Sequence, residues 1–484
     1  MIVCAPNEKF HYELEAIIRM FLPDCKVHFQ ERAQGDSDYV KVKTTADKIK
    51  DNNYNTVTLK LEDREESLSE TCSNTDRETE LSICRLLYQL LSKFTGHHVE
   101  WGILTGIRPV KLIRQMREEG YTETEIVQRF TKSYLVSEDK VQLCLETDKV
   151  QRPVIESALP KGYSLYVSIP FCPSRCSYCS FVSHSIEKTW KLIPEYLEKL
   201  CEELRHTANL VKEKGLLLQS VYVGGGTPTV LSAEQLRVLL AAVRQYFDFT
   251  LCQEFTVEAG RPDTIDLEKL IVLKEMGVDR ISINTQSLND EILQQIGRKH
   301  TVKEFLKAYE QAKMLDFTAI NVDLIAGLSG ETTDSFCKSL DQVIELEPEN
   351  ITVHALTVKR AATIRDEKSL HLNGISSVGN MINYSQKKLF ENGWKPYYMY
   401  RQKSTIDSLE NVGFAKDGTT GIYNIFIMDE THTILSVGGG GVTKLVLPNG
   451  GKIHRIFNYK YPYEYISRFE QLLQRKEEIM EFPL

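Results

Sequence analysis

The alternation of apolar and polar residues changes twice along the chain and divides it into three regions. Residues 1–155 predict an N-terminal α+β module, residues 160–377 alternate short β-rich runs with helical patterns, and residues 378–484 return to a mixed pattern. In the first region we expect strands at 26–30, 39–43 and 55–61, a polar loop at 62–76, and helices at 78–93, 110–118, 124–132 and 138–149. In the last region we expect helices at 378–392 and 463–476.

The central region carries the clearest pattern. Its expected strands are 163–169, 220–223, 254–258, 280–284, 319–323 and 351–355. Six such strand–helix units predict an α/β fold with a parallel sheet curled into a partial (β/α)6 barrel, followed by a C-terminal α+β extension. Active sites of such sheets lie at the carboxyl ends of the strands, so residues that follow the strands are the first candidates for chemistry.

Composition limits the cellular compartment and the partners that we expect for this chain. No run of about 18 uncharged apolar residues occurs, and the first residues do not resemble a secretory signal, so we expect no membrane association. The 11 cysteines are an odd number and mostly scattered, which favours a reducing cytoplasm. The net charge of −8 argues against nucleic acid as a partner. An anionic substrate would need basic residues concentrated in its pocket.

Three cysteines, Cys172, Cys176 and Cys179, lie in one short segment after the first barrel strand. Three thiolates are one too few for a closed tetrahedral zinc site, but they suit a four-iron cluster that leaves one iron open. A zinc site with His184 as fourth ligand and inert packing are the alternatives. An open iron can chelate the amino and carboxylate groups of S-adenosylmethionine.

Polar and glycine-rich elements follow the later strands. Residues 224–229, Gly-Gly-Gly-Thr-Pro-Thr, allow a backbone to approach a ligand closely, although such a turn alone is often only a tight turn. Glu258, Gln286 and Asp323 stand at the ends of the third, fourth and fifth strands, and Arg298 follows soon after the fourth. Each alone could cap a helix. Their recurrence at successive strand ends favours a ligand site.

These segments resemble the oxygen-independent coproporphyrinogen III oxidase family of radical SAM proteins, from about residue 160 to the C-terminus. Residues 104–111 and 410–414 are similar to the HemZ-type branch in particular. The resemblance implies a 4Fe-4S cluster held by the three cysteines and S-adenosylmethionine as cofactors. It also implies the following contacts to S-adenosylmethionine: Tyr166, Tyr178, Gly225, Gly226, Thr227, Glu258, Gln286, Arg298 and Asp323.

The reaction that the resemblance implies is oxidative decarboxylation of two propionates of coproporphyrinogen III, which gives protoporphyrinogen IX. The partners are then the porphyrinogen and an electron donor such as flavodoxin or ferredoxin. Two positions depart from the family pattern: Ser168 stands where a histidine is common, and Phe181 stands where some members have a further cysteine. A haem chaperone of the same family and a radical SAM methyltransferase that opens haem anaerobically stay open as alternatives.

The substrate carries four carboxylates, so cations are expected near the last strands. Lys359 follows the sixth strand, and Arg401 follows the segment Tyr397-Tyr-Met-Tyr400. Together with Tyr166 they are our candidates for catalytic or substrate-binding residues. A solvated basic turn is the alternative for the cations, and core packing is the alternative for the tyrosines.

Overall fold

The computed structural model describes residues 1–5, 7–31, 37–47, 51–179, 184–356, 375–402, 408–447 and 452–484. They form two compact units, the first drawn mainly from Met1–Leu145 and the second mainly from the rest of the chain. The regions expected as barrel (160–377) and C-terminal extension (378–484) lie together in the second unit. They do so because both contribute strands to one sheet.

The first unit is a five-stranded sheet in the order β2-β1-β3-β4-β5, with helix α2 packed on β4 and β5. Its elements are β1 (Ile2–Cys4), α1 (His11–Phe21), β2 (His28–Phe29), β3 (Tyr39–Asp47), β4 (Asn52–Leu61), β5 (Arg64–Ser73), α2 (Asp76–Thr95), α3 (Pro109–Glu118), α4 (Glu123–Gln128) and α5 (Glu138–Glu156), which crosses into the second unit.

The prediction of a loop at 62–76 is wrong, because most of this segment is strand β5. Its side chains are nearly all polar, so no apolar alternation marks it. Pairing with β4 holds it instead, and hydroxyl pairs cross between the strands at Thr56–Ser69 (2.9 Å) and Thr58–Ser67 (2.7 Å). A polar, charged edge strand also resists unwanted pairing with another chain.

The second unit is built on an 11-stranded sheet, and the predicted partial barrel is confirmed. Six strands run parallel in the order β13-β12-β11-β10-β9-β6, and β16 adds a seventh parallel strand beside β6. The six are β6 (Gly162–Ile169), β9 (Leu217–Gly225), β10 (Glu254–Glu258), β11 (Arg280–Ser282), β12 (Ala319–Ala326) and β13 (Asn350–Ala355). The remaining strands are β7 (Phe171–Cys172), β8 (His184–Ser185), β14 (Lys395–Arg401), β15 (Glu410–Ala415), β16 (Thr433–Val437), β17 (Val442–Leu445) and β18 (His454–Phe457).

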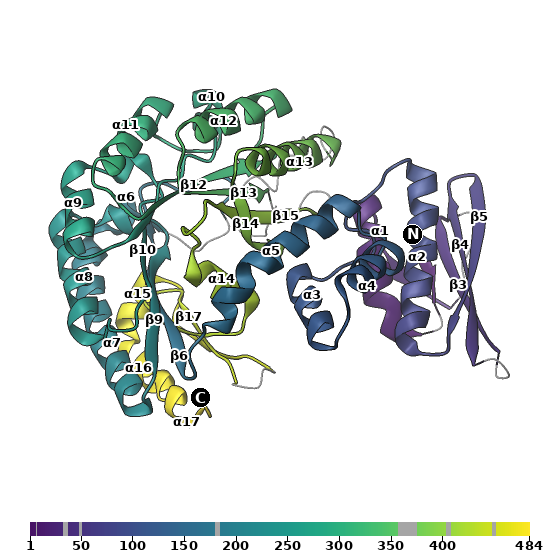
Figure 1. The fold of residues 1–484 in the computed structure, drawn as a ribbon, viewed down its shortest axis with the longest axis horizontal. Coiled ribbons are helices and arrows are strands. Elements are labelled where there is room, and N and C mark those ends of the chain that lie inside the picture. Colours follow the sequence, from purple (N-terminus) through teal and green to yellow (C-terminus); the bar gives the residue numbers. More distant parts are fainter. Residues whose placement is uncertain are drawn as a thin grey trace. The chain divides into compact units, whose positions relative to one another are not determined.

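Helices cover the outer, convex side of this curved sheet, whereas α14 lies inside the curve and packs on β9 and β14 (Figure 1). Capping boxes at Ser232 and Thr301 fix the starts of two outer helices, α8 and α11. The helices of the second unit are α6 (Ile186–Thr189), α7 (Ile193–Lys214), α8 (Ala233–Tyr246), α9 (Leu267–Glu275), α10 (Asp290–Gln295), α11 (Val302–Lys313), α12 (Thr333–Glu345), α13 (Ile375–Glu391), α14 (Ile422–Asp429), α15 (Pro462–Ser467), α16 (Phe469–Lys476) and α17 (Glu478–Glu481). The helix expected at 463–476 is therefore divided into α15 and α16.

A buried ionic network fastens the C-terminal helices to the barrel. Glu203 on α7 accepts hydrogen bonds from the Tyr465 hydroxyl (2.5 Å), the Gly438 N–H (2.7 Å) and the Asn458 amide (2.8 Å). Lys476 completes the network at 3.0 Å, and both charged side chains are at most 1% exposed. Because every partner of the carboxylate is supplied by a different C-terminal segment, Glu203 fixes the turn after β16 beside the barrel.

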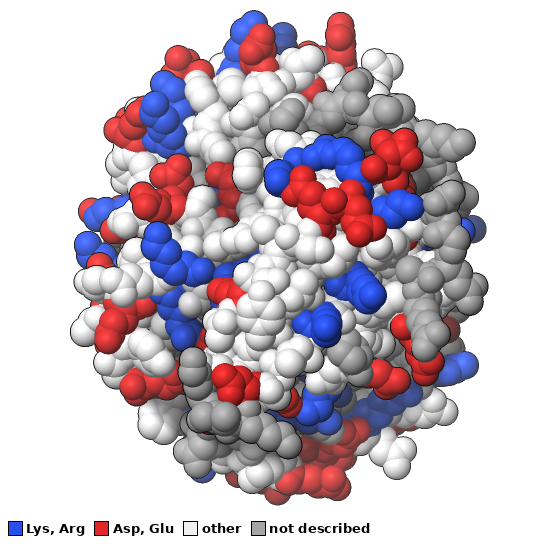
Figure 2. Space-filling view, turned by 90° about the vertical axis from the view of Figure 1, so that its right-hand side faces the viewer, with Lys and Arg blue, Asp and Glu red and all other residues white. Residues whose placement is uncertain are grey.

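The surface gives no large area of one charge on the face shown in Figure 2, where basic and acidic side chains are interspersed. In the first unit, basic and acidic side chains also form ion pairs with each other, such as Lys93–Glu66 and Arg85–Glu70. No helix in the described part of the chain is both long and apolar enough to cross a bilayer.

Candidate active site

A cavity of about 360 Å³ opens at the carboxyl ends of the parallel strands. It extends from the cysteine segment past the ends of β9, β10, β12 and β13 to β14. Eleven of the residues proposed from the sequence line it: Cys172, Cys176, Tyr178, Cys179, Gly225, Gly226, Thr227, Glu258, Gln286, Arg298 and Asp323. Their positions follow from the parallel sheet, which brings all strand ends to one edge.

The cysteine segment is held by three hydrogen bonds to two other parts of the barrel. Thr227 donates to the Cys172 sulfur (3.4 Å), and the Ser177 N–H donates to the carbonyl of Ile296 (3.0 Å) at the end of α10. Ser174 donates to the carbonyl of Gly297 (3.1 Å). These hydrogen bonds anchor the backbone of the segment, and all three of its cysteines line the cavity.

The geometry does not favour the zinc alternative. His184 does not line the cavity, and its ring packs 5.5 Å from that of Tyr461. Three thiols facing one cavity are instead the donor set that suits a four-iron cluster.

The glycine turn after β9 lies directly against the backbone before Cys172. The Gly226 N–H donates to Ile169 O and the Thr227 N–H donates to Phe171 O, both at 2.7 Å. A Cβ at Gly226 would stand 2.4 Å from the Phe171 carbonyl oxygen, and Gly225 has φ +110°. Only glycine permits this approach, so the Gly-Gly-Gly sequence allows the turn after β9 to pack closely against the backbone that leads to Cys172.

Glu258 projects from the end of β10 into the cavity. Its carboxyl group accepts a hydrogen bond from the Tyr222 hydroxyl at 2.7 Å. Burial raises the pKa of Glu258 to about 7, which the Tyr222 hydrogen bond offsets only in part. The group can therefore change charge near neutral pH, which is typical of a functional carboxylate.

The fourth and fifth strands supply Gln286 and Asp323. Gln286 has φ +75°, an unfavourable conformation for a side chain larger than glycine, and its backbone is bonded to Asp323 O and Ile325 N. Asp323 accepts a hydrogen bond from Asn321 (2.6 Å), and its other oxygen lies 3.6 Å from His354 Nε2. The strained glutamine and the oriented carboxylate occupy adjacent parts of the cavity wall.

Arg298 lies beside the cysteines and is mostly engaged with protein atoms. Its guanidinium donates to the carbonyls of Asn284 and Gly260 and to the Tyr178 hydroxyl (3.0 Å). Its Nε has no hydrogen-bond partner among the described residues, although it is buried. A buried donor without a partner is costly, so this N–H fits a site for a ligand acceptor.

Two proposed residues do not line the cavity, and a third is not among the described residues. Tyr166 does not line the cavity; its ring stacks at 6.1 Å on both Tyr222 and Tyr423. Arg401 is 4% exposed and is not among the lining residues, whereas Tyr400 and Gln402 are. Lys359 falls outside the described residues, as does Phe181.

At Ser168, the hydroxyl donates to the Gly439 carbonyl (2.8 Å). A Cβ at Gly438 would lie 2.3 Å from the Ser168 carbonyl oxygen. The small side chain at position 168 therefore belongs to the close packing of β6 against the glycine turn after β16.

Sequence reasoning missed several lining residues, above all Arg261, Tyr222 and His354. Arg261 is in Gly-Arg-Pro-Asp, which is typical of a turn, and Tyr222 is in the middle of a predicted strand. His354 offered a signal, because it is near the end of a barrel strand just as Asp323 is.

The residues present fit a radical SAM cofactor set. The donor set is three thiols, Gly225 and Gly226 line the cavity beside them, and the Arg298 Nε is buried without a described partner. A cluster would be held by Cys172, Cys176 and Cys179, next to an open space lined with polar groups. These features define a radical SAM protein.

Comparisons with known proteins agree with this class. Residues 166–343 match the Radical SAM superfamily. The chain is 38% identical over 413 residues to the oxygen-independent coproporphyrinogen-III oxidase-like protein HemZ of Bacillus subtilis, covering 84% of this chain and 82% of that one. It is 30% identical over 328 residues to the heme chaperone HemW of Lactococcus lactis, covering 67% and 80%. The chain therefore belongs to the oxygen-independent coproporphyrinogen III oxidase family of radical SAM proteins, and its cofactors are a 4Fe-4S cluster and S-adenosylmethionine.

A solved structure shows the same fold. Coproporphyrinogen III oxidase (HemN) from Escherichia coli matches with a TM-score of 0.53 at 23% identity, covering 66% of this chain and 71% of that one. The likeness supports the partial barrel.

Proposed function

We propose that this protein carries out the oxidative decarboxylation of two propionates of coproporphyrinogen III, giving protoporphyrinogen IX without oxygen. The observation that carries the proposal is the continuity of one cavity from the three cysteines to an aromatic and amide-lined wall. The similarity to HemZ, whose name describes an oxidase-like protein, supports the choice of substrate.

The cofactor residues have distinct tasks in this proposal. The three cysteines hold the cluster, and Gly225, Gly226 and Thr227 leave space beside it for the methionine end of S-adenosylmethionine. Glu258, Gln286, Arg298 and Asp323 bind its polar groups. When bound, these cofactors supply the one-electron chemistry that removes a hydrogen atom from the substrate. The protein orients the propionate carbon toward that chemistry and excludes water.

The opposite wall would bind the macrocycle. Tyr398, Tyr400, Asn411, Asn424 and Met428 all line it. Aromatic and thioether side chains can pack on the faces of a flat ring, and the amides can donate to its carboxylates.

Cations for the four carboxylates are scarce among the described lining residues. Arg261 is engaged with protein acceptors and Arg298 is assigned to S-adenosylmethionine, so we propose the polar side chain of His354 as a contact to a propionate. Lys359 stays a proposed contact as well. The buried position of Arg401 gives no support for direct contact with substrate.

A haem chaperone is the second candidate, because the chain also covers most of HemW at 30% identity. The same aromatic wall could bind haem without any turnover. The two functions differ in product, and one experiment separates them.

The experiment is an anaerobic assay of the reconstituted protein with coproporphyrinogen III, S-adenosylmethionine and a strong one-electron reductant, followed by mass analysis. We expect each of two propionates to lose carbon dioxide and two hydrogen atoms. The Cys176→Ala variant should give no product, whereas Cys201→Ala, at a cysteine on α7 outside the cavity, should retain it. Tight haem binding by a wild-type protein that forms no product would overturn the oxidase proposal in favour of the chaperone.

A further inference from the structure

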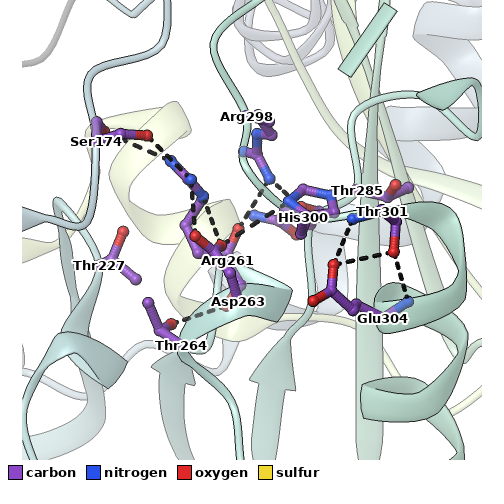
Figure 3. A network of polar contacts seen from close by, with 12 residues as sticks. Ser174, Thr227, Arg261, Asp263, Thr264, Thr285, Arg298, His300, Thr301 and Glu304 are labelled. Carbon is purple, nitrogen blue, oxygen red and sulfur yellow. Dashed lines mark hydrogen bonds and ion pairs between the residues drawn. The ribbon is translucent and has the colours of Figure 1, made fainter. Parts of the chain in front are cut away.

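Arg261 lies in the turn after β10, where its guanidinium connects the cavity wall to the cysteine segment (Figure 3). The residue is 3% exposed. Its Nε and Nη2 each donate to a different oxygen of Asp263 at 3.0 Å, and Nη2 also donates to the Ser174 hydroxyl at 3.1 Å. The remaining nitrogen, Nη1, lies 3.5 Å from the Ser174 carbonyl oxygen and 3.6 Å from the sulfur of Cys176. One edge of the guanidinium is thus fixed by a carboxylate, and the other is directed at a cluster-binding thiol.

The surroundings leave this orientation little freedom. A bidentate arginine–carboxylate pair is planar and geometrically specific, so Asp263 determines where Nη1 points. His300 lies near the same carboxylate, with Nδ1 3.9 Å from Asp263 Oδ1. Burial, and next the charge of Arg298, lower the pKa of His300 to about 3, so this histidine is neutral at physiological pH. Asp263 therefore has Arg261 as its charged partner here.

We propose that Arg261 is a positioning residue for Cys176 and that its N–H group stabilises the reduced state of the cluster. The proposal rests on the proposed function only in requiring a cluster on the three cysteines. On reduction, one electron passes from a one-electron donor to the cluster, no bond breaks, and the cluster becomes more negative by one charge. A cationic donor at a ligand sulfur favours the more negative state, because hydrogen bonds to sulfur and local charge set cluster potentials.

The role of Asp263 follows from the same geometry. Without its carboxylate the guanidinium keeps its charge but loses the partner that directs Nη1 at the sulfur. We therefore expect Arg261 and Asp263 to act together on the cluster and not through S-adenosylmethionine or the porphyrinogen.

The test is a redox titration of the reconstituted, substrate-free protein, with the reduced cluster followed by electron paramagnetic resonance. Arg261→Gln should bind normal iron and shift the midpoint potential to lower values. Asp263→Asn should lower the potential by less, because loss of the carboxylate that orients Arg261 is partly offset by loss of its negative charge. Arg280→Gln is the matched control. Arg280 is also buried and hydrogen-bonded (2.6 Å to Asn350), but it lies at the start of β11 and does not line the cavity, so its loss should leave the potential unchanged.

Two results would overturn the inference. The first is a wild-type potential in Arg261→Gln, and the second is an equal shift in Arg280→Gln. If Arg261→Gln binds no iron, the Arg261→Lys variant, which keeps the positive charge, takes its place in the titration. It should then bind iron at a potential below that of wild type, and a wild-type potential there would contradict the proposal. Absence of product from the wild-type protein would refute the proposed function but would not change this titration, which contains no substrate.

Discussion

We predict that the raised pKa of Glu258 makes S-adenosylmethionine binding sensitive to pH. The carboxyl group lies in the cavity and has a pKa of about 7, compared with an ordinary value of 4.5. S-adenosylmethionine is cationic, so it favours the ionised carboxylate. Below about pH 7 most Glu258 carboxyl groups are protonated. Binding must then remove that proton, so the affinity for S-adenosylmethionine should fall.

The magnitude follows from that pKa. At about pH 6 roughly nine-tenths of Glu258 would be protonated, and at about pH 8 roughly one-tenth, so the affinity of wild-type protein should rise about tenfold between them. Glu258→Gln cannot ionise, so it should bind more weakly at about pH 8 and lack this tenfold rise. The amino group of the ligand also titrates, but its contribution is common to all variants and cancels when they are compared.

The assay is anaerobic calorimetry of S-adenosylmethionine binding to reconstituted protein at the two pH values. Glu331→Gln is the matched control, because burial raises the pKa of Glu331 to about 7 as well, yet Glu331 does not line the cavity. It should retain the wild-type pH dependence. The same pH dependence in Glu258→Gln and wild type would refute the assignment of Glu258.

The raised pKa also has a consequence for folding. The protonated form is favoured in the folded protein, so Glu258 contributes stability that is fully present below about pH 4.5 and is lost as pH rises through about 7. The contribution is at most about 3 kcal/mol at acidic pH. Urea denaturation should show that Glu258→Gln lacks this part of the pH dependence.

Three further changes test other parts of the structure. Cys172→Ala should remove most of the iron without unfolding the chain, as iron analysis and circular dichroism would show; retention of a full cluster would exclude that ligand. Glu203→Gln should lower the free energy of unfolding by about 3–5 kcal/mol in urea denaturation, because it leaves Lys476 buried without its counter-ion, whereas Glu275→Gln at an exposed ion pair should cost at most about 1 kcal/mol. Gly226→Ala should abolish S-adenosylmethionine binding, because the close Phe171 oxygen would displace the glycine turn, and unchanged affinity would show that this close packing is not needed.

Local sequence carried most of the information about the cofactor side of the site. The cysteines are close in sequence, and Glu258, Gln286 and Asp323 follow apolar strands, so their meeting at one sheet edge could be predicted from the parallel fold. Arg261 could not be predicted in the same way. Its role depends on the distance from a turn after β10 to a sulfur on another loop, and no spacing in the sequence encodes that distance.

The substrate side was harder, partly because of strand alternation. Successive side chains of a strand point to opposite faces. Tyr398, Tyr400 and Gln402 line the cavity, whereas Arg401 between them does not. The prediction of Arg401 was based on its charge and did not take this two-residue alternation into account. Strand β5 was missed for the converse reason, since its cross-strand hydroxyl pairs leave no apolar pattern.

The central claim is that three cysteines and the strand-end residues form one radical SAM site. Its most direct test is electron paramagnetic resonance of the reduced, reconstituted protein before and after addition of S-adenosylmethionine. We predict about four irons per chain and a clear change of the reduced-cluster spectrum, because the cofactor binds the iron that has no cysteine ligand. Stoichiometric zinc with little iron, or a cluster spectrum that S-adenosylmethionine leaves unchanged, would contradict the account.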